Sequence, residues 1–264
     1  MEKLNFIGII PARYASTRFP GKPLAMLGDK PVIEHVYHQA RKALETVIVA
    51  TDDERIFACV EAFGGKAVMT SPDHPCGTNR CFEAYLKYRG HVSANDVVIN
   101  VQGDEPFIRP EQIALLKSCF PTEIATLVKA FTEEDGIEAL KNPNSPKVLV
   151  TNGKALYFSR SVIPYLRGVE ENDWLRESLR RGRPYYKHIG MYAYRADVLE
   201  QLVRLPQSPL ELAESLEQLR WLEAGYTIRV AETDMQTIGI DTPEDLSTAE
   251  RLLKNGQWAM ENGQ

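Results

Sequence analysis

Short apolar runs alternate with amphipathic segments along the first 100 residues. The runs at 6–10, 46–51, 66–70 and 96–101 are rich in β-branched residues and predict buried strands. The segments at 31–44, 52–63 and 78–88 place apolar residues at helical spacing, and Gly64-Gly65 is suited to end the second of them. Alternating strands and helices predict a parallel sheet with right-handed crossovers.

The pattern changes after about residue 120. A strand is predicted at 124–131, and the apolar runs 147–150 and 155–158 flank Asn152-Gly153, a strong hairpin signal. Tyr186–Arg195 alternates as a strand, and Ser208 opens a helix with leucines at 212, 216, 219 and 222. Late strands at 226–230 and 237–240 precede a helix at 243–253 with Thr242 as its N-cap, whereas 168–183 is typical of a loop or lid. We expect a single α/β domain over 1–264 with a strand-rich subregion at about 120–200.

Composition and charge narrow the class of protein. The 264 residues are long enough for a full hydrophobic core, and 44% hydrophobic with 25% charged residues is ordinary for a globular chain. A net charge of −5 argues against long nucleic acid as a partner. With no apolar run of about 20 residues and no secretory signal, we expect a cytoplasmic protein that does not cross a membrane. The four cysteines lack the spacing of a zinc site and are expected to be reduced.

Ligands of open parallel sheets bind at the carboxyl ends of the strands, and the loop at 11–23 follows the first strand. It carries three cations, of which Arg13 offers a planar fork and Lys22 a compact charge, while Gly21 frees backbone amides. We expect it to cradle phosphate groups; a solvated basic loop is the alternative. Because Gly21-Lys22 is followed by proline and no GxGxxG occurs, it is neither a P-loop nor a standard dinucleotide motif.

Two further strands run into carboxylates. Asp104 and Glu105 follow the strand ending at Val101, and Asp241 follows the predicted strand at 237–240. A carboxylate that faces a triphosphate is most simply explained by a divalent cation between them. If the two strands end side by side, Asp104 and Asp241 form one metal site, with Glu105 pointing away. The alternative for Asp104 is a turn-former before Pro106.

Eight blocks occur in order at 13–24, 77–80, 100–106, 157–160, 187–190, 209–211, 216–220 and 239–245. Together they resemble the 3-deoxy-manno-octulosonate cytidylyltransferase (CMP-Kdo synthetase) family from about residue 6 to 253. The resemblance implies a Rossmann-like sugar-nucleotide transferase fold with a mixed, mostly parallel sheet flanked by helices. It also implies a cytoplasmic homodimer, Mg²⁺, and the reaction of CTP with 3-deoxy-D-manno-octulosonate (Kdo) to give CMP-Kdo and pyrophosphate for lipopolysaccharide biosynthesis.

The resemblance also implies roles for individual residues. Phosphates of CTP would be bound by Arg13 and Lys22, and magnesium by Asp104 and Asp241, the four residues implied as catalytic. The nucleoside side would be lined by Ala12, Gly77, Thr78, Arg80 and Gln102. The sugar acid would contact Gln102, Arg160, His188, Tyr192, Glu217 and Gln218. This chain departs from the family pattern at Cys76, Asn79 and Lys187, where a small polar residue, an acid and arginine are expected.

Elementary chemistry leaves alternatives for the sugar-side residues. Arg160 suits a carboxylate, and His188 and Tyr192 share one face of a strand. A structural histidine and an exposed helix charge are the alternatives for His188 and Glu217. Rival functions are a cytidylyltransferase for sialic acid or 8-amino-Kdo, and a non-catalytic CTP-binding sensor. The pairing of Asp104 with Asp241 argues against the sensor.

Overall fold

The computed structural model describes residues 3–235 and 238–255. Among these residues, two compact units are found: unit 1 contains 3–117, 193–203 and 238–255, and unit 2 contains 118–192 and 204–235. Each unit is described by itself, and the prediction of one domain over 1–264 stays a prediction. No helix of the described ranges is both long and apolar enough to cross a membrane.

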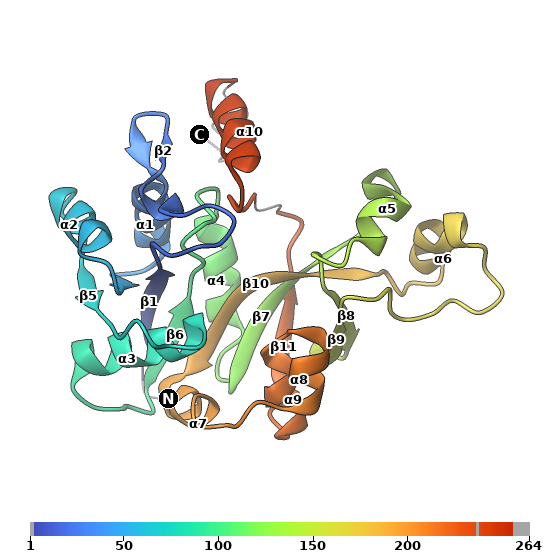
Figure 1. The fold of residues 1–264 in the computed structure, drawn as a ribbon. Helices are drawn as coiled ribbons and strands as arrows, with labels where there is room; N and C mark the ends of the chain where they lie inside the picture. Colours follow the sequence, from blue (N-terminus) through green and yellow to red (C-terminus); the bar gives the residue numbers. More distant parts are fainter. Residues whose placement is uncertain (1–2, 236–237, 256–264) are drawn as a thin grey trace. The chain divides into compact units, whose positions relative to one another are not determined.

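Unit 1 is built on four parallel strands in the order β5-β4-β1-β6 (Figure 1). The strands are β1 (Asn5–Ala12), β4 (Thr46–Thr51), β5 (Ala67–Met69) and β6 (Asp96–Asn100), with a small pair β2 (Met26–Leu27) and β3 (Lys30–Pro31). Ile9 lies opposite both Ile48 and Asn100. Because β4 and β6 lie on opposite sides of β1, the strand order reverses between β1 and β6, which is where such sheets bind ligands.

The helices of unit 1 are α1 (Val32–Ala43), α2 (Glu54–Ala62), α3 (Gly77–Arg89), α4 (Pro110–Ser118, its last residue in unit 2), α7 (Ala196–Leu202) and α10 (Pro243–Lys254), with the 3-10 turn η1 (Lys22–Leu24). Capping side chains are found at the N-terminal ends of two of these helices. Thr242 and Asp245 form the capping box of α10, and the Asp53 carboxylate accepts from two amides at the start of α2. The sequence predictions for α1, α2, α3 and α10 are confirmed to within two residues.

Unit 2 contains strands in the order β10-β7-β11-β9-β8. They are β7 (Ile124–Ala130), β8 (Lys147–Thr151), β9 (Lys154–Ser159), β10 (Tyr186–Arg195, whose last three residues lie in unit 1) and β11 (Ile228–Glu232). β7 and β11 are parallel, whereas β9 is antiparallel to both β8 and β11. Asn152 and Gly153 both have positive φ, 51° and 68°, as a type I′ hairpin requires, so the predicted hairpin is confirmed.

The helices of unit 2 are α5 (Gly136–Lys141), α6 (Trp174–Arg180), α8 (Pro209–Glu214) and α9 (Gln218–Glu223), with 3-10 turns η2 (Glu133–Asp135) and η3 (Glu171–Asp173). The prediction of a loop or lid over 168–183 is wrong for α6. Leu175 packs into an apolar cluster with Phe131 and Leu140, while Glu177 and Arg180 form an ion pair of 2.8 Å on its polar side. The charges that suggested a loop are the solvated face of an amphipathic helix.

Two other predictions are wrong. The helix predicted from 208 through Leu222 is two helices, because Ser215 adopts a left-handed conformation with φ 52° after α8. Residues 238–240 are not in a strand, and Thr237 lies outside the described residues. Ile240 instead donates one backbone hydrogen bond of 2.8 Å to the carbonyl of Asp104. A single long-range bond thus replaces the predicted strand.

Candidate active site

A cavity of about 410 Å³ lies in unit 1 where β1 and β6 end. Its wall includes residues 11–13, 15–17, 22–23, 77 and 102–104. Among them are six of the residues that the sequence assigned to the nucleotide side, namely Ala12, Arg13, Lys22, Gly77, Gln102 and Asp104. The cavity therefore forms at the point of strand-order reversal, where the topology favours ligand binding.

Gly103 allows the two loops that frame this cavity to approach each other. A Cβ at Gly103 would lie 2.7 Å from the carbonyl oxygen of Pro11, a contact that side chains do not make. The absence of a side chain at Gly103 thus admits the backbone that follows β1. At Gly77 a Cβ would lie 3.4 Å from Pro11, an ordinary packing distance, so this glycine is not required for a close approach.

Lys22 brings the two predicted metal ligands together. Its Nζ contacts Oδ2 of Asp104 and lies 3.0 Å from Oδ1 of Asp241, and Arg18 pairs with the other oxygen of Asp241 at 3.0 Å. Burial disfavours the ammonium, but the charge and hydrogen bond of Asp104, followed by those of Asp241, outweigh it and raise the pKa of Lys22. Lys22 is therefore a charged ammonium between two carboxylates.

The backbone holds Asp241 beside Asp104 through its neighbours. Ile240 donates to the Asp104 carbonyl at 2.8 Å, and the Asp245 carboxylate accepts from the amides of Asp241 and Thr242 at 3.0 and 2.9 Å. Because Asp245 and Thr242 cap α10, the Asp241 carboxylate is not used for capping.

The donor set suits a hard divalent cation. The carboxylates of Asp104 and Asp241 converge on one point, which the Lys22 ammonium occupies. Carboxylate oxygens are among the ligands that Mg²⁺ prefers. Within 3–235 and 238–255, no group of three or more His, Cys, Asp or Glu residues could hold a metal. The chain offers two ligands here, so the remaining coordination positions would fall to substrate oxygens and water, the arrangement typical of magnesium with phosphates.

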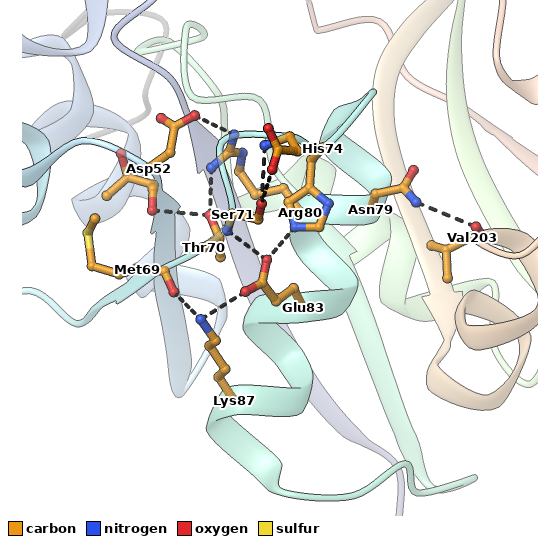
Figure 2. A network of polar contacts seen from close by, with 12 residues as sticks. Asp52, Met69, Thr70, Ser71, His74, Asn79, Arg80, Glu83, Lys87 and Val203 are labelled. Carbon is orange, nitrogen blue, oxygen red and sulfur yellow. Dashed lines mark hydrogen bonds and ion pairs between the residues drawn. The ribbon is translucent and has the colours of Figure 1, made fainter.

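Arg13 is oriented by the loop between β5 and α3. Its guanidinium donates to the carbonyl of His74 at 2.6 Å, and the His74 ring contacts Glu83 of α3. Figure 2 shows Glu83 also accepting from the Ser71 amide at 2.9 Å and from Lys87 at 2.8 Å. Burial alone would raise the pKa of Glu83, but Lys87, the Ser71 amide and His74 lower it to about 2. The ionised Glu83 thereby fixes the loop that holds Arg13.

Arg80 lies beneath this loop and does not line the cavity. Its side chain is fully buried, with one guanidinium nitrogen 2.7 Å from Oδ2 of Asp52 and another 2.5 Å from Oγ1 of Thr70 (Figure 2). Thr78 is also buried, at 3% exposed. The structure thus gives Arg80 a fold-stabilising ion pair, and the nucleoside contacts of Arg80 and Thr78 stay predictions.

The two positions that depart from the family pattern on α3 contact each other. The Cys76 thiol lies 2.9 Å from Oδ1 of Asn79, and the Asn79 amide lies 3.5 Å from the carbonyl of Val203 (Figure 2). Neither side chain lines the cavity. Their departure from the pattern therefore leaves the wall of the cavity unchanged.

In unit 2, a row of rings in edge-on and tilted contact joins two predicted sugar-side residues. The His188 ring lies 5.2 Å from both Phe158 and Tyr192, and Tyr192 meets Trp221 edge-on at 5.0 Å. Nε2 of His188 is 3.1 Å from Oγ1 of Thr126. Burial lowers the pKa of His188 to about 3, so the imidazole is neutral at physiological pH.

Glu217 and Gln218 lie at the start of α9. Glu217 accepts from Arg220 at 2.7 Å. Burial, and then the negative charge of Glu217, hold the pKa of Tyr192 well above its usual range, which places Glu217 near the row of rings. The side chain of Gln218 is buried, and its Nε2 has no hydrogen-bond partner among the described residues. An unsatisfied buried amide is costly, so this donor is a good candidate for a ligand contact.

Arg160 is held by backbone carbonyls. Its guanidinium donates to the carbonyls of Glu214, Pro143 and Ser215 at 2.6, 2.9 and 3.2 Å. The Glu214 carboxylate accepts from the Ser159 hydroxyl at 2.6 Å and the Arg160 amide at 2.9 Å. Sequence reasoning missed Glu214, because one acid on a helix gives no signal of its partners.

A cavity at a strand-order reversal, with two cations and two converging carboxylates, fits a nucleotidyltransferase. The family model described as cytidylyltransferase matches residues 7–228. The chain belongs to the 3-deoxy-manno-octulosonate cytidylyltransferase family. Its relative of that name from Phocaeicola vulgatus is 62% identical over 256 residues, covering 95% of this chain and 98% of the relative. The one from Bacteroides thetaiotaomicron is 60% identical, covering 96% and 99%.

Solved structures agree with this assignment. A structure of CMP:2-keto-3-deoxy-manno-octonic acid synthetase complexed with CTP is 42% identical, with a TM-score of 0.83 over 95% of this chain and 99% of that one. A glucose-1-phosphate thymidylyltransferase from Bacillus anthracis, in complex with a sucrose, is 15% identical with a TM-score of 0.62, covering 95% and 96%, and shows the fold alone. The predicted fold class and family resemblance are confirmed.

Proposed function

We propose that the protein transfers CMP from CTP to Kdo, releasing pyrophosphate and giving CMP-Kdo for lipopolysaccharide biosynthesis. The observation that carries this function is the 62% identity to an enzyme of that name over 95% of the chain. The meeting of Lys22, Asp104 and Asp241 beside the cavity supports it, because a transferase for nucleotides needs both cations and carboxylates there.

The reaction is an in-line attack of the anomeric hydroxyl oxygen on the α-phosphorus of CTP, with pyrophosphate as the leaving group. Arg13 and Lys22 bind the phosphate oxygens and so supply positioning and charge neutralisation, the main sources of acceleration in such transfers. Asp104 and Asp241 would hold Mg²⁺, which when bound offsets phosphate charge and lowers the pKa of the attacking hydroxyl.

Unit 2 supplies the residues for the sugar acid. The neutral His188 and the neighbouring Tyr192, whose rings are in tilted contact, offer hydrogen bonds without charge. Gln218 offers a buried amide donor, and Glu217 a carboxylate acceptor for sugar hydroxyls. Arg160 supplies positive charge for the sugar carboxylate. A homodimer and a cytoplasmic location remain predictions from the resemblance.

The test is pyrophosphate release with CTP, UTP, ATP and GTP against Kdo, 8-amino-Kdo and sialic acid, with and without Mg²⁺. We expect turnover that requires CTP, Kdo and Mg²⁺ together. Turnover with another acidic sugar and none with Kdo would replace the sugar assignment. Binding of CTP without any turnover would identify a sensor.

A further inference from the structure

The ammonium of Lys22 lies between the two carboxylates proposed to bind a divalent cation. We infer that Lys22 is an internal counter-cation that holds Asp104 and Asp241 when no metal is bound, so that Lys22 and the metal exclude each other. This inference rests on the proposed function of the site. It assigns Lys22 a second role, in metal binding, besides its proposed contact with phosphates.

The geometry makes a cation necessary at this point. The backbone hydrogen bond from Ile240 to the Asp104 carbonyl holds the two residues side by side, and both carboxylates contact the Lys22 ammonium. Two carboxylates that contact the same ammonium lie close enough to repel each other when that positive charge is removed. The Lys22 side chain is 16% exposed, so solvent screens its contact with Asp104, which is 27% exposed, less than its contact with Asp241, which is 43% exposed. A metal that enters must therefore displace an ammonium that already neutralises its ligands.

The same cavity offers the displaced ammonium another partner. Lys22 and Arg13 both line it, and a lysine ammonium on a flexible four-carbon stem can turn from a carboxylate to a phosphate oxygen. When CTP binds, the Lys22 ammonium would contact its phosphate oxygens in place of the aspartates. Asp104 and Asp241 would then be available to hold the metal. Metal and nucleotide consequently raise each other's affinity, a coupling that must be reciprocal.

The test measures Mn²⁺ binding to the full chain by the electron paramagnetic resonance of free Mn²⁺, without nucleotide. Lys22→Met keeps most of the stem and removes the charge. We expect Lys22→Met to bind Mn²⁺ at least about tenfold more tightly than the natural chain. The gain should vanish in Lys22→Met/Asp104→Asn. With CTP, the natural chain should bind Mn²⁺ more tightly than Asp104→Asn, which serves as the baseline for metal held by nucleotide alone.

Two matched variants sharpen the comparison. Arg18→Met removes a cation that contacts Asp241 alone and is 62% exposed, so its gain in Mn²⁺ affinity should be smaller. Lys42→Met makes the same chemical change on the exposed side of α1 and should leave Mn²⁺ binding unchanged. Lys22→Gln repeats the test with a polar side chain in case Lys22→Met does not fold.

The outcomes separate the inference from the proposed function. Unchanged or weaker Mn²⁺ binding by Lys22→Met and Lys22→Gln overturns the inference and leaves the metal site standing. A gain that persists in Lys22→Met/Asp104→Asn also overturns it, because the metal would then bind elsewhere. If the natural chain with CTP binds no more Mn²⁺ than the Asp104→Asn baseline, the proposed metal site fails.

Discussion

Replacing Asp52 by asparagine is expected to destabilise unit 1 strongly. Asp52 is the charge partner of Arg80, whose side chain is fully buried, at an N–O distance of 2.7 Å. Asparagine keeps the shape and one acceptor oxygen but removes the charge, so the buried guanidinium is left with only neutral partners, such as the Thr70 hydroxyl. Breaking a buried pair in this way costs about 3–5 kcal/mol. Because Asp52 is 16% exposed, we expect the lower end, about 3 kcal/mol.

Thermal unfolding followed by circular dichroism measures this loss, which corresponds to a fall in Tm of about 6–12 °C for a chain of this size. Arg80→Met removes the other charge, and the double variant Asp52→Asn/Arg80→Met should lose less stability than the sum of the two single changes. A loss below about 1 kcal/mol together with a higher KM for CTP would refute the reasoning. It would show that Arg80 serves the nucleotide and not the fold.

Three other changes test the site and the fold. Asp104→Asn or Asp241→Asn should lower kcat with CTP and Kdo by about 100-fold or more, and a near-normal kcat for either variant removes that residue from the site. Burial lowers the pKa of His188 to about 3, so the unfolded chain takes up a proton below about pH 6.5 that the folded chain does not. The contribution of His188 to the free energy of unfolding is therefore complete above pH 6.5 and falls by about 2 kcal/mol by pH 5. Urea titrations at pH 8 and pH 5 should show that this loss is absent in His188→Gln. An equal loss of unfolding free energy in the natural chain and in His188→Gln would contradict the prediction. Thr242→Ala removes the N-cap of α10 and should cost about 1 kcal/mol in the same titration, whereas Thr242→Ser should cost little.

Elements whose buried residues lie close together in sequence were predictable. Thr46–Thr51 and Tyr186–Arg195 match β4 and β10 to the residue, because each is a run of β-branched or aromatic side chains with a clear periodicity. The Asn152-Gly153 hairpin and the Thr242 cap follow from local backbone chemistry. Local rules suffice where the decisive contacts are local.

Elements decided by a distant contact were not predictable. Ser215 ends α8 in a left-handed conformation although the leucines on either side continue a helical spacing. Residues 238–240 are not in a strand, and Ile240 donates a backbone hydrogen bond to Asp104. The sequence around Asp241 does not indicate the hydrogen bond from Ile240 to Asp104, and the sequence around Arg160 does not indicate the carbonyls that accept from it.

The candidate site shows the same division. The cavity wall could be predicted, because loops that follow parallel strands meet at the strand-order reversal. The partners of its charged side chains could not, because a sequence gives the type of a side chain and not its orientation. The ion pair of Arg80 with Asp52 and the bridge from Lys22 to two aspartates were not predicted from the sequence, while the nucleoside role of Arg80 and the phosphate role of Lys22 stay predictions.

The division of the chain between the two units has a consequence for its synthesis. The polypeptide passes between the units four times, so neither unit corresponds to one continuous fragment. During translation, Asp104 emerges from the ribosome long before Asp241, and the whole of unit 2 is made in the interval. A nascent chain that stops before Ile240 would thus carry Lys22 paired to one aspartate, with the second half of its cation site still unmade.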